Sequence, residues 1–351
     1  MNKSLSDVNV ILDVLQPAIP ENLGKLAVFV KSETAPSGDG ETPQAASTSA
    51  SIQAFTDVEE LLNKVTNKDV QNLAKGYFNQ SNHGEEFYVI SYSDLTAALD
   101  GYFGEGWEFA TVVGDEADSA VLSNYVEGKG TKFAVVGLEA TDANVEAAET
   151  FNQTYIGNKR TIAFMAGTGD DTKYAVGALI GKLGNETVGA ITWKFKTLNG
   201  VKAIDFTKAQ IDKLHKNGIF TYVNKAGIDQ TSDGITIGGE FIDALHGDDW
   251  VKASIENNVQ NLLTTSGKVT FDSSGIAQID GVVTSVLQDA TTNGIVLIDA
   301  ESGQGQYTVT AQSRADTPAE DIAQRHYNGL SFSYTRAGAI HSVTVHGTVS
   351  L

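Results

Sequence analysis

The side chains best suited to chemistry are few and scattered along the sequence. The chain contains no cysteine, which excludes disulfides, thiolate nucleophiles and thiolate metal sites. Six histidines occur, and no two of them stand in a His-Glu-x-x-His spacing. His341 and His346 would lie on opposite faces of a strand, so they could not chelate one ion together. The sequence therefore predicts no catalytic residue, no metal site and no cofactor.

The densest polar cluster consists of Asp243, His246, Asp248 and Asp249. Acidic side chains are favoured in the first turn of a helix, where they interact with the positive end of the helix dipole. We interpret the cluster as the start of a helix. A nucleophile elbow of the form Gly-x-Ser-x-Gly does not occur in the sequence.

A glycine-containing turn at Gly167–Thr172 follows an apparent strand and precedes an apparent helix, as a phosphate-binding loop would. It lacks the Lys-Ser/Thr pair of such loops, and it places Asp170 and Asp171 where the phosphate charge would lie. A tight strand-to-helix turn is the favoured interpretation. The alternative is an α/β ligand-binding protein or enzyme with a nucleotide-like turn at these residues.

The composition limits the class of protein further. The 351 residues suggest two domains, and 41% apolar residues can form a real core. The formal net charge of −20 disfavours direct nucleic-acid binding, because phosphates are neutralised by Lys and Arg. Neither a signal peptide nor an apolar run long enough to span a membrane is present, so we expect a protein made in a cytoplasm without membrane insertion.

The middle of the chain has the pattern of an α/β fold. Between Phe87 and Leu183, short apolar strands alternate with helical segments, which is typical of βαβ units and a largely parallel sheet. Two long amphipathic helices follow. Their apolar stripes are Val251, Ile255, Val259, Leu262 and Leu263 in the first, and Ile276, Ile279, Val283, Val286 and Leu287 in the second.

Both ends of the chain have the alternating pattern of strands. Val8–Leu15 alternates with period two and stops before Pro17 and Pro20, which cannot continue a ladder. At the other end, Gly329–Thr335 is one predicted strand and Ile340–Leu351 is another, with a turn between them. The terminal strands have no obvious local partner, and an unpaired strand edge is a template for another chain.

Four stretches of the sequence resemble the contractile-tail sheath proteins of bacteriophages, in the compact branch found in tailed phages, prophages and phage-tail-like particles. The first is Leu5–Val10 with the strand and prolines that follow, the second is Thr192–Val201, and the fourth is Ala337–Val349. The third is a group of short ranges, namely Gly239–Asp243, Asp249–Lys252, Lys268–Val269 and Ser274–Ile276. With the order of the elements, they cover nearly the whole chain. The low-complexity stretch from 33 to 51 departs from the family pattern.

The resemblance implies a structural protein rather than an enzyme. Members of the family form stacked hexameric rings around a tail tube, and the sheath contracts to drive the tube through the host envelope for genome delivery. The implied partners are further copies of the chain, the tail tube protein, and the baseplate and tail terminator proteins. The implied location is the virion, after assembly in the bacterial host cytoplasm. Terminal strands of one subunit add to the sheets of others.

We therefore predict a two-domain α/β sheath subunit with extended N- and C-terminal strand-exchanging arms. The predicted parts are an N-terminal arm (1–24), an outer domain (25–200, with a loop at 33–51), an inner, tube-facing domain (201–330) and a C-terminal strand and arm (331–351). The predicted exchange residues are Val8, Val10, Leu12, Val14, Ile340, Val343, Val345, Val349 and Leu351. The predicted arm hinges are Pro17, Pro20 and Gly338.

Overall fold

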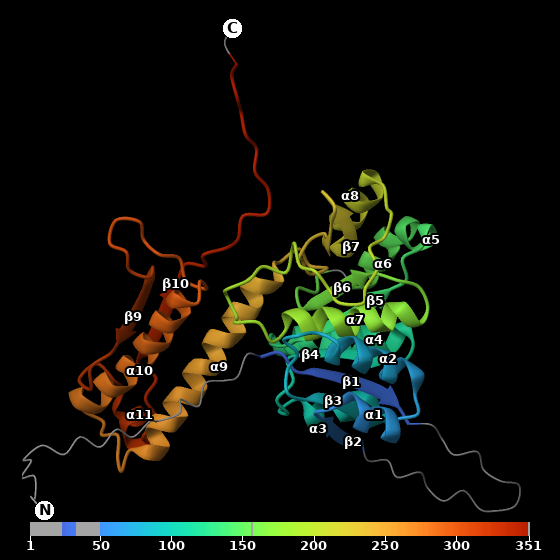
Figure 1. Cartoon of the computed structure of the whole chain (residues 1–351). Coiled ribbons are helices and arrows are strands. Elements are labelled where there is room, and N and C mark those ends of the chain that lie inside the picture. The colour runs from blue at the N-terminus through green and yellow to red at the C-terminus, as the bar shows by residue number, and fades with distance from the viewer. Residues whose placement is uncertain (1–22, 33–49, 156, 350–351) are drawn as a thin grey trace, which may run out of the picture.

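The computed structural model describes residues 23–32, 50–155 and 157–349 of the chain (Figure 1). Several predicted exchange and hinge residues lie outside the described residues: Val8, Val10, Leu12, Val14, Pro17, Pro20 and Leu351. Most of the predicted low-complexity loop from 33 to 51 lies outside them too, although Ser51 already begins a strand.

One large sheet forms the centre of the molecule. Its strands are β1 (Leu26–Lys31), β2 (Ser51–Phe55), β3 (Phe87–Tyr92), β4 (Phe109–Val113), β5 (Phe133–Leu138), β6 (Thr161–Met165), β7 (Ile219–Lys225) and β8 (Ile228–Thr231). Their order is β2-β3-β1-β4-β5-β6-β7-β8. The strands from β3 to β7 in this order run parallel, and β2 and β8 pair antiparallel at the two edges. The predicted parallel α/β sheet is confirmed.

Helices cover both faces of this sheet, which is why its central strands are almost continuously apolar. On one face, α1 (Val58–Lys64), α2 (Lys68–Phe78) and α7 (Asp170–Leu183) pack on side chains such as Val28 and Phe164. On the other face lie α3 (Leu95–Tyr102), α4 (Glu116–Lys129), α5 (Asp142–Glu146), α6 (Ala148–Thr154) and α8 (Lys208–Lys216). The alternation predicted between Phe87 and Leu183 is confirmed.

The contact between α2 and α7 is unusually close. A Cβ atom added to Gly177 of α7 would lie 1.9 Å from the carbonyl oxygen of Leu73 in α2. No real side chain tolerates that distance from a backbone atom, so the two helix backbones touch at this point. Together with Gly76 and Gly181, which make similar contacts, Gly177 allows the two helices to pack backbone against backbone.

Replacing Gly177 by alanine should destabilise the subunit by about 2 kcal/mol or more, because α2 and α7 must move apart. Gly281→Ala is the matched control, since this glycine lies in a helix and its added Cβ would meet nothing within 4 Å. The control should gain about 0.5–1 kcal/mol from the better helix propensity of alanine. Denaturant unfolding of the unassembled protein measures both. A Gly177→Ala variant as stable as the wild type would contradict the close helix contact.

A second unit follows the large sheet and has its own apolar cluster around Trp250, Val283 and Leu287. It consists of α9 (Ile242–Thr265), α10 (Ser273–Thr292), β9 (Tyr307–Ala311), α11 (Ala319–Gln324) and β10 (Leu330–Tyr334). The two predicted long helices are confirmed. Strands β9 and β10 pair antiparallel and form a separate two-stranded sheet. We call residues 23–241 the sheet body, residues 242–336 the C-terminal unit and residues 337–349 the C-terminal extension.

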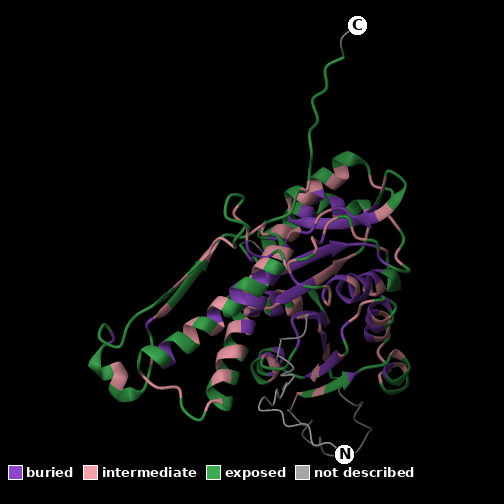
Figure 2. Cartoon of the chain, turned by 60° about the vertical axis from the view of Figure 1, so that its left-hand side comes forward, coloured by how far each residue is buried: buried purple, intermediate pink, exposed green. Residues whose placement is uncertain are grey.

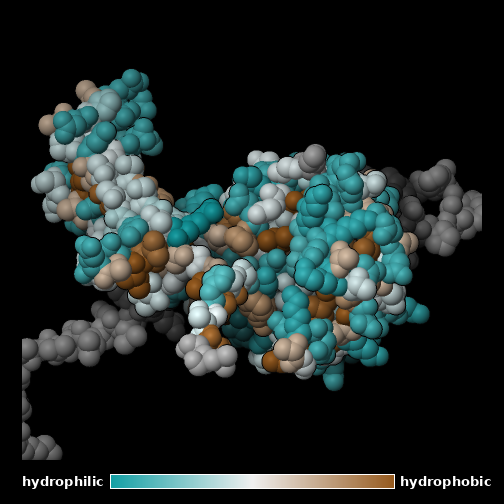
Figure 3. Space-filling view, turned by 90° about the horizontal axis from the view of Figure 1, so that it is seen from above, coloured by the Kyte–Doolittle hydropathy of each residue, from teal (hydrophilic) through white to brown (hydrophobic). Residues whose placement is uncertain are grey.

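Helix α9 belongs to both units (Figure 1). Its first half is buried, from Ile242 to Ser254, and its second half is largely exposed, as Figure 2 shows. Seen from above in Figure 3, the two units form lobes of unequal size. The large sheet passes the predicted domain boundary at residue 200, because β7 and β8 extend it to Thr231. The assignment of an outer and an inner, tube-facing domain stays a prediction.

Candidate assembly surfaces

The C-terminal extension exposes apolar side chains that a single chain does not cover. Residues 337–349 belong to no helix or strand. Ile340, Val343, Val345 and Val349 have exposed fractions of 80%, 76%, 85% and 93%. Single exposed apolar residues are ordinary, but four within ten residues of an extended segment form a continuous apolar stretch. The extension therefore offers a surface that another molecule could cover.

The extension has the period-two pattern of a half-buried strand. Val343, Val345 and Val349 share one face, and Gly347 lies between them on that face. The opposite face carries Ser342, Thr344, His346 and Thr348. Ile340 would lie on the same face as these polar residues, so the apolar stripe begins at Val343. A strand of this kind is stable when its apolar face packs on a layer and its backbone pairs with a sheet edge.

Within the single chain, the described part of the predicted strand, residues 340–349, is unpaired. Strand β10 pairs with β9, in a register that joins Leu330 to Ala311 and Tyr334 to Tyr307. The pattern of residues 340–349 is that of a strand, yet no described residue of the same chain pairs with it. A strand needs a partner as well as an alternating pattern, and the pairing of this segment with another copy stays a prediction.

The two-stranded sheet of β9 and β10 has the same residue pattern as the extension. Tyr307, Val309, Leu330 and Tyr334 face the apolar cluster of the C-terminal unit. The alternate positions carry hydroxyls, namely Thr308, Thr310, Ser331 and Ser333. A two-stranded sheet is marginally stable by itself, and its outer edges leave backbone groups free to pair.

A buried polar network joins α9 to the sheet body. The Asp249 carboxylate accepts a hydrogen bond from the Arg160 guanidinium, and both side chains are about nine-tenths buried, with exposed fractions of 7% and 10%. Glu108, at the start of β4, is 5% exposed and shares a hydrogen bond with Asp249. Lys132 donates to the Trp107 carbonyl and lies over the Trp107 ring at 4.3 Å. The network links three strands of the sheet to one helix of the C-terminal unit.

The two buried carboxyl groups of this network hold a proton between them. Burial raises the pKa of Glu108 well above its ordinary value, and the nearby Asp249 charge raises it further. Burial also raises the pKa of Asp249, but the Arg160 guanidinium opposes this directly. We therefore place the proton on Glu108, which donates to the Asp249 carboxylate.

The interpretation of Asp243, His246, Asp248 and Asp249 as a helix start was incomplete. Asp243 lies in the first turn of α9, as predicted. The other three contact distant parts of the chain. His246 Nε2 donates to the Leu23 carbonyl at 3.0 Å, and burial lowers its pKa to about 4, so the ring is neutral near pH 7. Asp248 accepts hydrogen bonds from Tyr334 and Arg336 at the end of β10.

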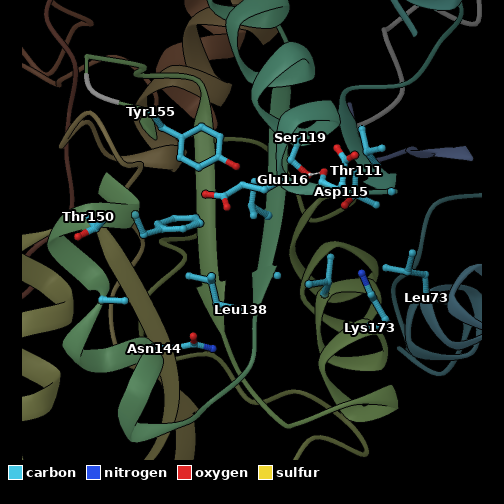
Figure 4. Close-up of a pocket in the computed structure, with 17 residues that line it drawn as sticks. Leu73, Thr111, Asp115, Glu116, Ser119, Leu138, Asn144, Thr150, Tyr155 and Lys173 are labelled. Atoms are coloured by element: carbon cyan, nitrogen blue, oxygen red, sulfur yellow. Dashed lines mark hydrogen bonds between the residues drawn. The ribbon is translucent and has the colours of Figure 1, made fainter. Parts of the chain in front are cut away.

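A cavity of about 410 Å³ lies at the carboxyl ends of β4 and β5, where open α/β sheets bind ligands (Figure 4). Several of its polar side chains have structural partners. Asp115 caps α4, and Lys173 lies 3.7 Å from Asp69. Burial is the main cause that raises the pKa of Tyr155 to about 12. The predicted phosphate-like turn is a tight turn between β6 and α7, and residues 167–172 do not line this cavity.

Neither a cluster suited to a metal ion nor a membrane-spanning helix is found among the described residues. In this part of the chain, no group of three or more His, Asp or Glu side chains could hold a metal ion. No described helix is long and apolar enough to cross a membrane.

Comparison with known proteins identifies the C-terminal unit. The family model "E217 tail sheath protein gp31-like, C-terminal domain" matches residues 242–349. The match begins at the first residue of α9 and includes the C-terminal extension. No curated protein matches the sequence.

Solved structures are similar over the whole chain. The sheath of the extracellular contractile injection system PVC, in its contracted state, has a TM-score of 0.71 at 12% identity, over 99% of this chain and 98% of that one. A chain of the anti-feeding prophage baseplate has a TM-score of 0.67 at 12% identity, over 100% of both chains. The contracted helical sheath of the anti-feeding prophage has a TM-score of 0.63 at 13% identity, over 99% of both.

The chain thus has the fold of a subunit of a contractile sheath, from the sheet body to the extension. Residues 242–349 match the model of a tail sheath protein domain, and the resemblance that the sequence indicated is confirmed. The mixed α/β architecture predicted for the subunit is confirmed as well.

The buried network gives a pH-dependent prediction. Above pH 4.5, the ordinary pKa of a glutamate, the unfolded chain loses the Glu108 proton while the folded chain keeps it. Folding stability contributed by this group therefore falls as pH rises towards the raised pKa, by at most about 1.4 kcal/mol per pH unit. Glu108→Gln keeps a donor for Asp249 and removes this loss, so the variant should exceed the wild type in stability at pH 8 but not at pH 4.

Denaturant unfolding of the unassembled protein across pH 4–8 measures this difference. Glu105→Gln, at an exposed carboxylate on the same loop, is the control and should leave the pH profile of the wild type unchanged. A Glu108→Gln variant whose stability runs parallel to that of the wild type at every pH would contradict the buried proton.

Proposed function

We propose that this chain is the structural subunit of a contractile sheath and acts as a polymer rather than as an enzyme. In this proposal, copies assemble as stacked hexameric rings around a tail tube, and contraction drives the tube through the host cell envelope for genome delivery. The observation that carries the proposal is the family match over residues 242–349, which includes the C-terminal unit and its exposed extension. The partners would be the tail tube, baseplate and tail terminator proteins, and assembly would take place in the host cytoplasm.

The joint between subunits would be formed by strand addition. The extension of one copy would pair with the sheet of β9 and β10 in another copy and place Val343, Val345 and Val349 over its apolar layer. Each main-chain hydrogen bond contributes about 0.5–1.5 kcal/mol net. Each buried valine adds about 1.5 kcal/mol or more. Several such terms per joint would hold neighbouring subunits together while their larger units move.

The N-terminal arm would contribute a second strand to the same kind of joint. Val8, Val10, Leu12 and Val14 alternate as the extension does, and Pro17 and Pro20 follow the strand as a hinge. This assignment rests on the sequence pattern and on the family resemblance. We propose further that the inner domain predicted over residues 201–330 faces the tube, an assignment that rests on the family resemblance.

Negative-stain electron microscopy of the purified protein at high concentration tests the assembly. We expect hollow tubes or stacked rings, either alone or after addition of the cognate tail tube protein as a template. The added template matters because the pure protein could require it. Particles that stay dispersed in both conditions, at low and at high salt, would contradict the sheath function.

The apolar face of the extension should be essential for assembly. The triple variant Val343→Thr, Val345→Thr, Val349→Thr keeps the shape and strand propensity of the segment but makes the face polar. A loss of only about 1.4 kcal/mol per joint raises the critical concentration for assembly roughly tenfold. Sedimentation of the polymer at a series of total protein concentrations measures this shift in the critical concentration.

Thr344→Ser with Thr348→Ser is the control, since both residues lie on the opposite face and remain hydroxylic. It should assemble nearly as the wild type does. Normal assembly of the triple valine variant, or of a chain that ends at residue 341, would show that the extension does not join the subunits.

A further inference from the structure

The C-terminal extension is held at its base and free beyond it. The His341 side chain is 15% exposed, whereas Ile340 and Val343 on either side are 80% and 76% exposed. Before it, the Ala337 amide donates to the Ile295 carbonyl at 2.9 Å. No hydrogen bond, ion pair or ring contact of residues 342–349 is found within the part of the chain that the structure describes. The change from held to free takes place within one residue.

His341 has two polar and two aromatic neighbours that precede α9, and it also lies near Asp243 at the start of that helix. Its Nε2 shares a hydrogen bond with the Thr192 hydroxyl at 2.7 Å, and its Nδ1 lies 3.4 Å from an Asp233 carboxylate oxygen. Its ring packs edge-on against Phe241 at 4.9 Å and against Phe195 at 6.2 Å between centroids. A side chain with two polar partners and two aromatic neighbours has little freedom to move.

The partners of His341 are themselves fixed. The Asp233 carboxylate lies 3.8 Å from the Lys194 ammonium and 3.7 Å from His215 Nδ1, and its own side chain is 15% exposed. Lys194 and Phe195 lie beside Trp193, which is 1% exposed in the core of the sheet body. Because Asp233 and Thr192 belong to the sheet body, His341 attaches the base of the extension to the large sheet rather than to β10.

We infer that the C-terminal extension pivots between His341 and Ser342, and that His341 is a positioning residue whose attachment to Thr192 and Asp233 makes the sheet body set the direction of the exchanging strand. The inference rests on the proposed strand exchange. It differs from the predicted hinge at Gly338, which lies inside the held stretch between Ala337 and His341. The positive φ of 67° at Gly338 shapes the path of the chain to Thr192.

The absence of cysteine from the chain allows a direct test with single labels. Ala339→Cys places a nitroxide before the inferred pivot, and Val345→Cys places one beyond it; both positions are exposed. In the unassembled protein, the spectrum should show restricted motion at residue 339 and fast motion at residue 345. Adding His341→Ala should raise the mobility at residue 339 several-fold and leave residue 345 unchanged.

His346→Ala is the matched control, because this histidine lies in the free part of the extension and is exposed. It should change neither label, and unfolding curves should show that His341→Ala is folded. Equal mobility at residues 339 and 345 in the wild type would overturn the inference. So would a label at residue 339 that stays restricted after His341→Ala.

A separate measurement distinguishes this inference from the proposed function. If a chain that ends at residue 341 still forms normal tubes, strand exchange by the extension is wrong. The label mobilities would then still decide where the extension pivots. If the truncated chain does not assemble and His341→Ala frees residue 339, both the exchange and the position of the pivot are supported.

Discussion

The buried ion pair between Arg160 and Asp249 fixes how the two units of the subunit are joined. The two residues are 89 positions apart in the sequence, and the pair is almost sealed from solvent. Removing one partner of such a pair leaves a buried charge uncompensated, which is why it holds a single arrangement even where it adds little net stability. The protonated Glu108 beside it and the neutral His246 one turn before Asp249 belong to the same buried interface.

The C-terminal unit and its extension are tied to the sheet body by different contacts. The Arg160–Asp249 network attaches helix α9 to the sheet body. Asp248 on the same helix accepts hydrogen bonds from Tyr334 and Arg336 at the end of β10. The chain then returns to the sheet body through His341. A displacement of the sheet body would therefore reach both the apolar layer under β9 and β10 and the base of the extension. In the proposed strand exchange, this arrangement would keep the donor strand and the acceptor sheet in a defined relation.

Local periodicity made much of this fold predictable. The alternating strands and helices between Phe87 and Leu183 and the apolar stripes of α9 and α10 follow directly from period-two and 3.6-residue patterns. The buried network was not predictable in the same way, because Glu108, Arg160 and Asp249 come together only in the folded chain. The predicted domain boundary at residue 200 does not coincide with an end of the sheet, which resumes at β7. The extension was recognised as a strand whose partner comes from another copy, but its pattern does not show to which sheet that partner belongs.

The geometry also explains why the extension does not simply pair with its own β9 and β10. The alternation of apolar and hydroxyl residues is the same in all three segments, so an intramolecular ladder would be chemically acceptable. In Figure 1, however, the extension leaves the molecule in a direction away from β9 and β10. Its base is held on the sheet body by Thr192 and Asp233, only one residue before the free segment begins. In the proposed strand exchange, a strand that matches a sheet it is turned away from would pair with the same sheet in another copy, where the free edges of both are satisfied together.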